Sequence, residues 1–584
     1  MNEPPPGIWT RPIRAATWFS LLAGGLILIV SVIALWARSW EVLLPGVAGS
    51  LILALVAFVG VLFVRSLCCW RHFRRFLFAI ACIVTLIALA YAEENWRGKQ
   101  AWYTHRARWE AKGEKFDLPA LAPPMVPDEK NFALTPLLKP AMDFTQGASG
   151  VVWQDTNGLA RLDKVSATLE PDRKTNSQLV LGNLEKGTFA DLTECARFYR
   201  GNTNYPQAAT TATSAETILV ALSKLDPQLT ELREAASNRP DSRFPVHYDS
   251  EPTWGILLPH LARIKTLTML PAVRATAELD AGRPAEAFAD LQLGFRMADS
   301  IKDEPLLIDH LVRIAALAID LQTLREGLVR HAWTDAQLAQ FETYLGSVDL
   351  LAEFKLAMRG ERACSTGGLD YIRRQGFFAD PMMYLGDEEG RAASTPAFGA
   401  MPRGWYYQNM LTISRIFQDF TLPAVDERAH RVFPQTSDNG VRAAQNLRTS
   451  PYTIFAKMLL PALERAARKS VRAQTYVDCA RVACALERYR LANGKIPDAL
   501  AALTPQFIDR IPDDVIDGKP LRYQPRPEGS YVLYSIGWNQ TDDGGQLAWA
   551  KKDRPSEIDI TRGDWVWEMP ADLRSARLAH AKSP

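Results

Sequence analysis

Two adjacent carboxylates near the C-terminus are the residues whose types and spacing most clearly suggest chemistry. Asp542 and Asp543 fall at the end of the stretch YVLYSIGWNQTDDGG, residues 531–545. Asp and Gly form turns readily, so a structural turn is the favoured interpretation. Carboxylates beside two flexible glycines also suit a hard cation. A catalytic acid pair is the third interpretation, but no base, nucleophile or oxyanion-stabilising group accompanies it in the sequence.

A second set of charged residues stands in apolar, helix-forming sequence. His310 lies in LLIDHLVRIAALAI, between Asp309 and Arg313. An acid, an imidazole and a guanidinium on one helix could line a site, although Asp309 and Arg313 also have the spacing of an ordinary helical ion pair. Glu361 and Arg362, in AMRGERACSTGG, are expected to end a helix and could face a cleft. Capping and solvation explain these two residues equally well.

Sequence motifs of the common enzyme classes are absent. The eight histidines are scattered, without HExxH, and there is no GxSxG, no phosphate-binding loop and no GxGxxG before a helix. The net charge is +2, from 67 Lys and Arg against 65 Asp and Glu. Such a balance gives no bulk attraction to nucleic acid, so we expect no nucleic-acid partner.

Three long apolar runs without charged residues open the chain. They cover residues 16–37, 42–64 and 76–92. A bilayer core needs about 20 apolar residues, whereas a signal peptide has a single apolar region of about 7–15 residues. A buried helical hairpin is the other alternative. We therefore predict a membrane domain over residues 1–92 with three transmembrane helices in the lipid bilayer.

The basic residues of the short loops predict how these helices are oriented. Arg11 and Arg14 precede the first run, and four arginines lie in the loop RSLCCWRHFRRF between the second and third runs. Because positively charged loops stay on the cytoplasmic side, the N-terminus is expected in the cytoplasm and the residues after 93 outside it. In a bacterium this corresponds to an inner-membrane protein with a large extracytoplasmic part.

The extracytoplasmic part divides by composition. Residues 93–190 are expected to form a juxtamembrane helix and a proline-rich extended strap, and residues 191–364 a mainly α-helical array. Within this array ATAELDAGRPAEAFADL has the pattern of one tetratricopeptide-type hairpin, with Gly282 closing one helix and Pro284 opening the next. Residues 365–455 are rich in glycine and aromatic residues and are expected to form a long loop.

Residues 456–584 have the pattern of a small α+β module. A helix is expected from Pro461 to about Asn493, followed by a hairpin with Gly529 in its turn. The segments ALERYRLANGKIPDALAAL, DGKPLRY, YVLYSIG and DDGG stand in this order. This order resembles the globular part of the major pseudopilins of type II secretion systems, over about a fifth of the chain.

The resemblance implies a long helix, a small antiparallel sheet and a calcium site after the SIG strand, for which Asp542 and Asp543 are the candidate ligands. The chain departs from that family because the corresponding helix contains Arg465, Arg468, Lys469 and Arg472 and cannot span a membrane. A polymerising pilin is therefore not expected. The whole chain also resembles membrane proteins of Verrucomicrobia and Planctomycetes, a resemblance that implies no function.

Two functions of different classes remain. The leading expectation is a non-enzymatic, membrane-anchored extracytoplasmic platform that binds or assembles an envelope or secretion protein, with calcium as the one cofactor considered. The alternative is an envelope hydrolase or transferase with a pocket under the 365–455 region. The cysteines have no zinc spacing, and Cys479 and Cys484 are expected on different faces of one helix, where they cannot bond to each other. Buried free thiols are the favoured interpretation of Cys195, Cys364, Cys479 and Cys484.

Overall fold

The computed structural model describes residues 21, 24–25, 27–29, 32, 70–147, 150–169, 181–375, 401–460, 464–549 and 557–573. The chain divides into two compact units, Met1–Trp96 and Arg97–Pro584. The first two predicted transmembrane helices fall largely outside the described residues.

Helix α3 (Trp70–Glu110) contains the third apolar run. It holds the one described segment, Phe73–Glu110, that is long and apolar enough to cross a membrane. A helix in the core of a soluble protein would hide its apolar side chains, whereas Phe78 and Leu86 are 71% and 66% exposed. This exposure, together with the length of the run, supports an association with a membrane.

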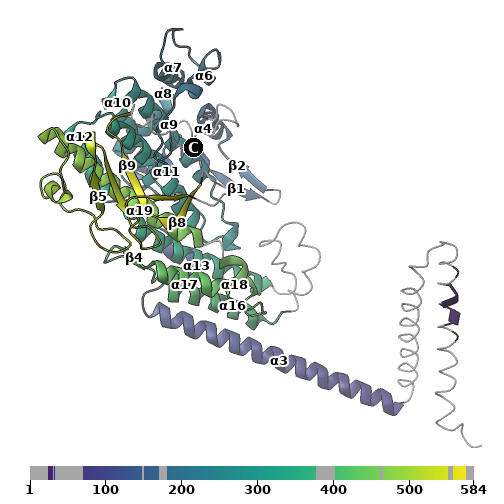
Figure 1. Ribbon diagram of the computed structural model, residues 1–584. Coiled ribbons are helices and arrows are strands. Elements are labelled where there is room, and N and C mark those ends of the chain that lie inside the picture. Colours follow the sequence, from purple (N-terminus) through teal and green to yellow (C-terminus); the bar gives the residue numbers. More distant parts are fainter. Residues whose placement is uncertain are drawn as a thin grey trace, which may run out of the picture. The chain divides into compact units, whose positions relative to one another are not determined.

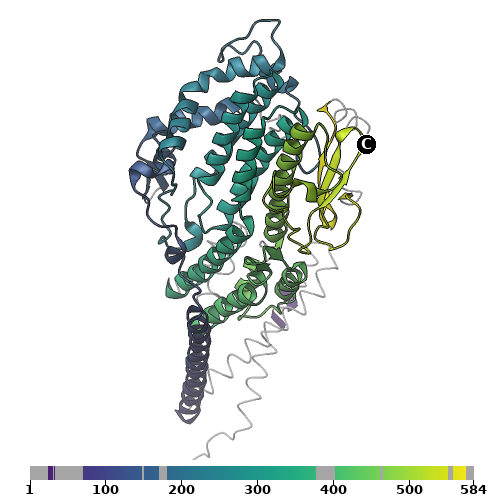
Figure 2. The same ribbon diagram turned by 90° about the vertical axis from the view of Figure 1, so that its left-hand side faces the viewer.

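The second unit is built mainly from helices, which Figures 1 and 2 show lying side by side over most of its length. They are α4 (Thr156–Leu169), α6 (Thr193–Tyr199), α7 (Ser214–Leu222), α8 (Asp226–Asn238), α9 (His260–Asp280), α10 (Pro284–Asp299), α11 (Leu307–Val329), α12 (Asp335–Gly346) and α13 (Leu350–Gln375). Apolar side chains of α7, α9, α10 and α11 fill the interior between them.

Local sequence signals position several of these helices as predicted. Gly282 follows the end of α9 with a positive φ of 72°, a conformation that costs glycine little. Pro284 is the first residue of α10, where its missing N–H needs no partner. Thr334 and Gln337 form a reciprocal capping box at the start of α12.

The region 365–455 differs from the predicted long loop. Helix α13 continues to Gln375, and further along come α16 (Arg403–Ile416), a π-helical turn (Phe417–Thr421), α17 (Pro434–Gln445) and α18 (Ile454–Leu459). Residues 376–400 lie outside the described part. Tyr406, Met410 and Ile413 are buried with helical spacing. The sequence therefore contains an amphipathic helical pattern here, but the many glycines and aromatic residues of the region led us to predict a loop.

Short strand pairs and one larger sheet complete the unit. The antiparallel pairs are β1 (Phe144–Gly147) with β2 (Gly150–Trp153), β3 (Val425–Asp426) with β4 (Arg431–Val432), and β7 (Leu547–Trp549) with β8 (Ile558–Gly563). The sheet has the order β5-β6-β9, from β5 (Arg522–Pro525), β6 (Tyr531–Ser535) and β9 (Trp565–Met569). Tyr523 faces Leu533 across the predicted hairpin, and Gly529 has a φ of 81° in its turn.

Helix α19 (Glu464–Asn493) joins this sheet to the helical body. In Figure 2 it lies between the yellow strands and the other long helices. Cys479, Cys484 and Leu486 on α19 belong to the same apolar cluster as Leu317 on α11, Phe341 on α12 and Leu533 on β6. The C-terminal segment and the helical array therefore share one core.

The cysteines follow the expectation from the sequence. Cys195, Cys364, Cys479 and Cys484 are free thiols, and three of the four are buried. Burial raises the pKa of Cys195 and of Cys364 to about 12, because an apolar environment disfavours the thiolate. They are unreactive packing residues rather than nucleophiles.

Candidate functional site

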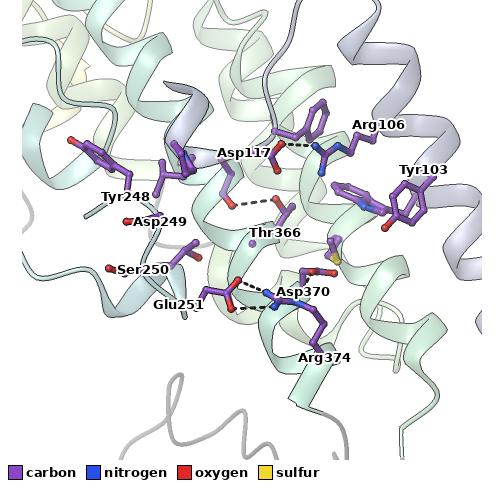
Figure 3. A pocket seen from close by; sticks show the side chains of 18 residues that line it. Tyr103, Arg106, Asp117, Tyr248, Asp249, Ser250, Glu251, Thr366, Asp370 and Arg374 are labelled. Carbon is purple, nitrogen blue, oxygen red and sulfur yellow. Dashed lines mark hydrogen bonds and ion pairs between the residues drawn. The ribbon is translucent and has the colours of Figure 1, made fainter. Parts of the chain in front are cut away.

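A cavity of about 310 Å³ lies between the C-terminal end of α3, residues 116–119, residues 248–253 and α13. Figure 3 shows that the labelled side chains of these segments surround it from several sides. The segments are far apart in the sequence, so the cavity exists only in the folded chain. Five of its lining residues, Thr366, Gly367, Asp370, Arg374 and Met410, come from the 365–455 region.

One wall of the cavity is aromatic. Trp102 is 3% exposed and packs edge-on against Phe116, with ring centroids 5.8 Å apart. The guanidinium of Arg362 lies behind this wall, 4.2 Å from the centre of the Phe116 ring. It donates to Glu114 at 2.9 Å and to the main-chain oxygen of Lys115 at 2.6 Å. Arg362 thus shapes the wall and is itself fully buried.

The rim of the cavity carries charges that are only partly paired. Arg106 donates to Asp117 at 2.6 Å. Arg374 donates to Glu251 and, through Nε at 3.1 Å, to Asp370. Figure 3 shows the contacts of Arg106 with Asp117 and of Arg374 with Glu251, and it shows Asp249 between Tyr248 and Ser250. The lining contains four carboxylates (Asp117, Asp249, Glu251, Asp370) against two guanidiniums (Arg106, Arg374). Arg373, outside the lining, also donates to Asp370 at 2.9 Å, so the carboxylates exceed the guanidiniums by two within the lining and by one when Arg373 is included.

The two threonine hydroxyls of the lining are engaged in holding the backbone. Thr366 donates to the main-chain oxygen of Arg362 at 2.8 Å, and Thr253 donates to that of Cys364 at 2.5 Å. None of the described lining residues is a histidine, a cysteine or a lysine. The arrangement has the charged and aromatic groups of a binding site, and its threonines are not set beside a base as nucleophiles are.

Buried acids lie behind the cavity. The hydroxyl of Tyr248, which lines the cavity, donates to Glu304. Burial raises the pKa of Glu304 to about 8 and that of Asp309 to about 7, because a charged carboxylate is poorly solvated in a protein interior. Burial also raises the pKa of Glu361, which accepts a hydrogen bond from the backbone N–H of Leu307 at 3.2 Å.

The structure places Glu361 and Arg362 differently from the sequence-based expectation. They lie in the interior of α13, more than ten residues before its end, and neither caps it. The helix continues because Gly360, Gly367 and Gly368 allow close packing against Pro305, Thr253 and Trp254. Glu361 caps the start of α11 instead, and Arg362 supports Phe116.

His310 is buried away from the lining of the cavity. Its Nε2 lies 2.8 Å from the Ser470 hydroxyl on α19. Arg313 donates to Glu353 and to Asp299, each at 2.7 Å, so the predicted pair with Asp309 is not formed. His310, Glu361 and Arg362 therefore do not converge on one site. Neither residues 248–253 nor the α3 residues of the lining were singled out from the sequence.

The Asp542–Asp543 loop is organised by a third acid, Asp564. Its carboxylate accepts backbone N–H groups from Asp543 at 3.2 Å, Gly545 at 2.6 Å and Gln546 at 3.3 Å. Asp542 accepts from the Tyr534 hydroxyl at 3.2 Å, and Asp543 accepts from Asn539 at 2.8 Å. These contacts are those of a structural turn. Over the described residues no group of three or more His, Cys, Asp or Glu side chains could hold a metal ion.

The chain matches no protein-family model, no curated protein and no solved structure. The resemblance to major pseudopilins and the calcium site that it implies therefore stay predictions.

Proposed function

We propose that the chain is a membrane-anchored binding protein. Helix α3 supplies the apolar candidate span, and its later residues Trp102, Tyr103 and Arg106 line the cavity. In this proposal the apolar runs 16–37 and 42–64 are two further spans, the N-terminus is cytoplasmic and the residues after 93 lie outside a bacterial inner membrane. The arginines of the loop between the second and third runs support that orientation.

The ligand of the cavity, we propose, is a basic side chain of an envelope protein. The observation that carries this is the excess of carboxylates over guanidiniums in the lining. Two opposite charges about 4 Å apart attract by roughly 1 kcal/mol in water and by more near a protein surface. Tyr103, which lines the cavity and is 47% exposed, adds a ring on which a guanidinium or ammonium group can rest.

The C-terminal segment, in this proposal, is a second docking surface for an envelope or secretion component. The resemblance to pseudopilins supports it, as does the calcium-binding role that the resemblance gives to Asp542 and Asp543. Because α19 is buried in a core shared with α11 and α12, a partner would contact this segment through its strands and loops. The alternative of a hydrolase or transferase gains no support from the threonines of the cavity, which hold the backbone.

The test uses the full-length protein in mild detergent and two short probe peptides, acetyl-Ser-Arg-Ser-Arg-Ser-amide and acetyl-Ser-Glu-Ser-Glu-Ser-amide. We expect the arginine peptide alone to bind. Asp249→Asn removes one exposed carboxylate from the lining and should weaken binding by about 1 kcal/mol, roughly fivefold in Kd. Glu129→Gln removes an exposed carboxylate that is outside the lining and should leave Kd unchanged. Equal binding of the two peptides would overturn the proposal.

A further inference from the structure

A second, larger cavity of about 670 Å³ lies among α7, the start of α8, α9 and the N-terminus of α10. It is built on the hairpin that the motif ATAELDAGRPAEAFADL forms, and the function proposed above does not use it. Leu219 and Val220 of α7 give it an apolar side. Arg274 and Glu278 of α9 also line the cavity, as does Arg283, the residue before α10.

A buried network of charges lies beside this cavity. Asp290 of α10 is fully buried and accepts from Arg233 of α8 and from Arg274 Nε at 3.1 Å. Arg274 also donates to Asp226 at 2.5 Å and lies 3.5 Å from Glu278 Oε1. The network thus contains three carboxylates and two guanidiniums. With every acid ionised it is one positive charge short of neutrality.

Glu278 is the member of the network that lacks a counter-charge of its own. Its side chain is 4% exposed and lines the cavity. Oε2 has no hydrogen-bond donor among the residues that the structure describes. A buried acceptor without a donor is unfavourable and calls for a proton or a ligand. Burial, the negative charge of Asp290 and a side-chain hydrogen bond with Asp290 raise the pKa of Glu278 to about 8, so at neutral pH Glu278 carries a proton that it can donate to Asp290.

We propose that this cavity binds a primary alkylammonium group, which donates to Glu278 Oε2 while its alkyl stem lies on Leu219 and Val220. The bound ammonium supplies the positive charge that the network lacks. Binding replaces the proton of Glu278, and that proton leaves to solvent, so charge balances. The group can belong to a lysine side chain of a polypeptide or to a free aliphatic amine.

The other charged groups around Glu278 are compatible with this exchange. Arg274 is engaged by Asp226 and Asp290, and Arg233 by Asp290. Hydrogen bonds from Thr213 and, to a smaller extent, the positive charge of Arg283 at the rim lower the pKa of Glu216 on α7, so the charges of Arg283 and Glu216 offset each other. Replacing the proton by an ammonium becomes easier as pH rises, and the affinity should increase up to tenfold per pH unit until Glu278 is ionised.

Isothermal titration of the full-length protein in detergent tests the site. The probes are butylamine and the peptides acetyl-Gly-Lys-Gly-amide and acetyl-Gly-Gln-Gly-amide, at pH 6.5, 7.5 and 8.5, in two buffers with different ionisation enthalpies. We expect the amine or the lysine peptide to bind at least tenfold more tightly at pH 8.5 than at pH 6.5, with release of about one proton at the lower pH. Binding of the peptide alone assigns the site to a polypeptide, and binding of butylamine assigns it to free amines as well.

Two variants keep the proposal falsifiable. Glu278→Gln keeps the shape of the side chain but cannot exchange a proton, so proton release should disappear and affinity at pH 8.5 should fall at least tenfold. Leu219→Trp fills the cavity from its apolar side without touching the charges and should also block binding. Asp303→Asn, an exposed carboxylate elsewhere, is the control and should bind as the unaltered protein does. The proposal is overturned if neither amine probe binds, or if binding is independent of pH and survives Glu278→Gln.

Discussion

Arg325 of α11 donates two hydrogen bonds to the main-chain oxygen of Glu568 on β9, from Nη2 at 2.8 Å and from Nε at 3.2 Å. The same guanidinium lies 3.3 Å from the main-chain oxygen of Gly187 and 4.1 Å from the centre of the Phe189 ring. It is 1% exposed. One side chain therefore joins the helical body, the edge of the C-terminal sheet and the segment before α6, which are far apart in the sequence.

We expect Arg325→Met to destabilise the protein by about 3 kcal/mol, because it leaves several buried main-chain oxygens without a donor. Burial lowers the pKa of Arg325 to about 10, so the side chain is still charged at neutral pH. Urea denaturation of the full-length protein in detergent measures the change. Arg197→Met is the control: Arg197 is 69% exposed and pairs with Glu194, so its loss should cost less than about 1 kcal/mol. Equal effects would contradict the role of Arg325.

The buried acids behind the first cavity predict how stability depends on pH. Asp309 has a pKa raised to about 7 in the folded protein from an ordinary value of 3.8. Between these values the folded state holds the proton and the unfolded state releases it. The free energy of unfolding should therefore fall as pH rises from about 4 to about 7, by up to roughly 1.4 kcal/mol per unit from this group, and then level off.

Asp309→Asn should flatten this dependence and make the protein more stable than the unaltered chain at pH 8. Urea denaturation at pH 5, 6, 7 and 8 measures the slope. Glu304, whose pKa is raised to about 8, contributes with the same sign, so a part of the slope should remain. Asp303→Asn is an exposed control. Parallel curves for Asp309→Asn and the unaltered protein would show that Asp309 is not protonated in the fold.

Features that depend on a few neighbouring residues were predictable from the sequence. The C-terminal end of α9 follows from Gly282 and the start of α10 from Pro284. The start of α12 follows from Thr334 and Gln337. The β5–β6 hairpin follows from alternation around Gly529. In each case the interactions that decide the structure are local: they are made within a helix cap, within a turn or between neighbouring residues of a strand.

The candidate site was not predictable in the same way. Its lining joins α3, residues 248–253 and α13, and no local pattern records which of these segments meet. The sequence directed attention to His310, whose partner Ser470 lies 160 residues away. It also suggested that α13 ends near Arg362, because glycine usually weakens a helix. The contacts that override this preference are made by Pro305 and Trp254, outside that helix.

The turn at Asp542 and Asp543 should depend more on Asp564 than on either of them. Asp564→Asn leaves one carbonyl oxygen where two carboxylate oxygens accept three backbone N–H groups. We expect a loss of about 1–3 kcal/mol, whereas Asp543→Asn should cost less than about 1 kcal/mol, because Asp543 is exposed and among the described residues its carboxylate accepts from Asn539 alone. Thermal unfolding compares the two variants. A larger effect of Asp543→Asn would contradict the organising role of Asp564.

The calcium site implied by the pseudopilin resemblance has a separate test on the same loop. Calcium that binds the folded state alone raises its stability. If Asp542 and Asp543 are ligands, millimolar calcium should raise the Tm of the unaltered protein, and the double variant Asp542→Asn with Asp543→Asn should lose this increase. Magnesium at the same concentration is the ionic-strength control. An equal response of the unaltered and double-variant proteins would remove these residues from the calcium hypothesis.

Substitution by alanine should change the free energy of unfolding by very different amounts at two glycines of α13. A Cβ at Gly360 would lie 1.7 Å from the main-chain oxygen of Pro305, which cannot move aside without shifting the start of α11. Gly360→Ala should therefore cost more than about 3 kcal/mol or prevent folding. A Cβ at Gly367 would lie 3.0 Å from Cγ2 of Thr253, a side-chain atom that can shift slightly. Since alanine favours a helix over glycine by about 1 kcal/mol, Gly367→Ala should be within about 1 kcal/mol of the unaltered protein. Urea denaturation of both variants decides the matter: similar costs would mean that helix propensity, and not the close approach of α13 to Pro305, governs this helix.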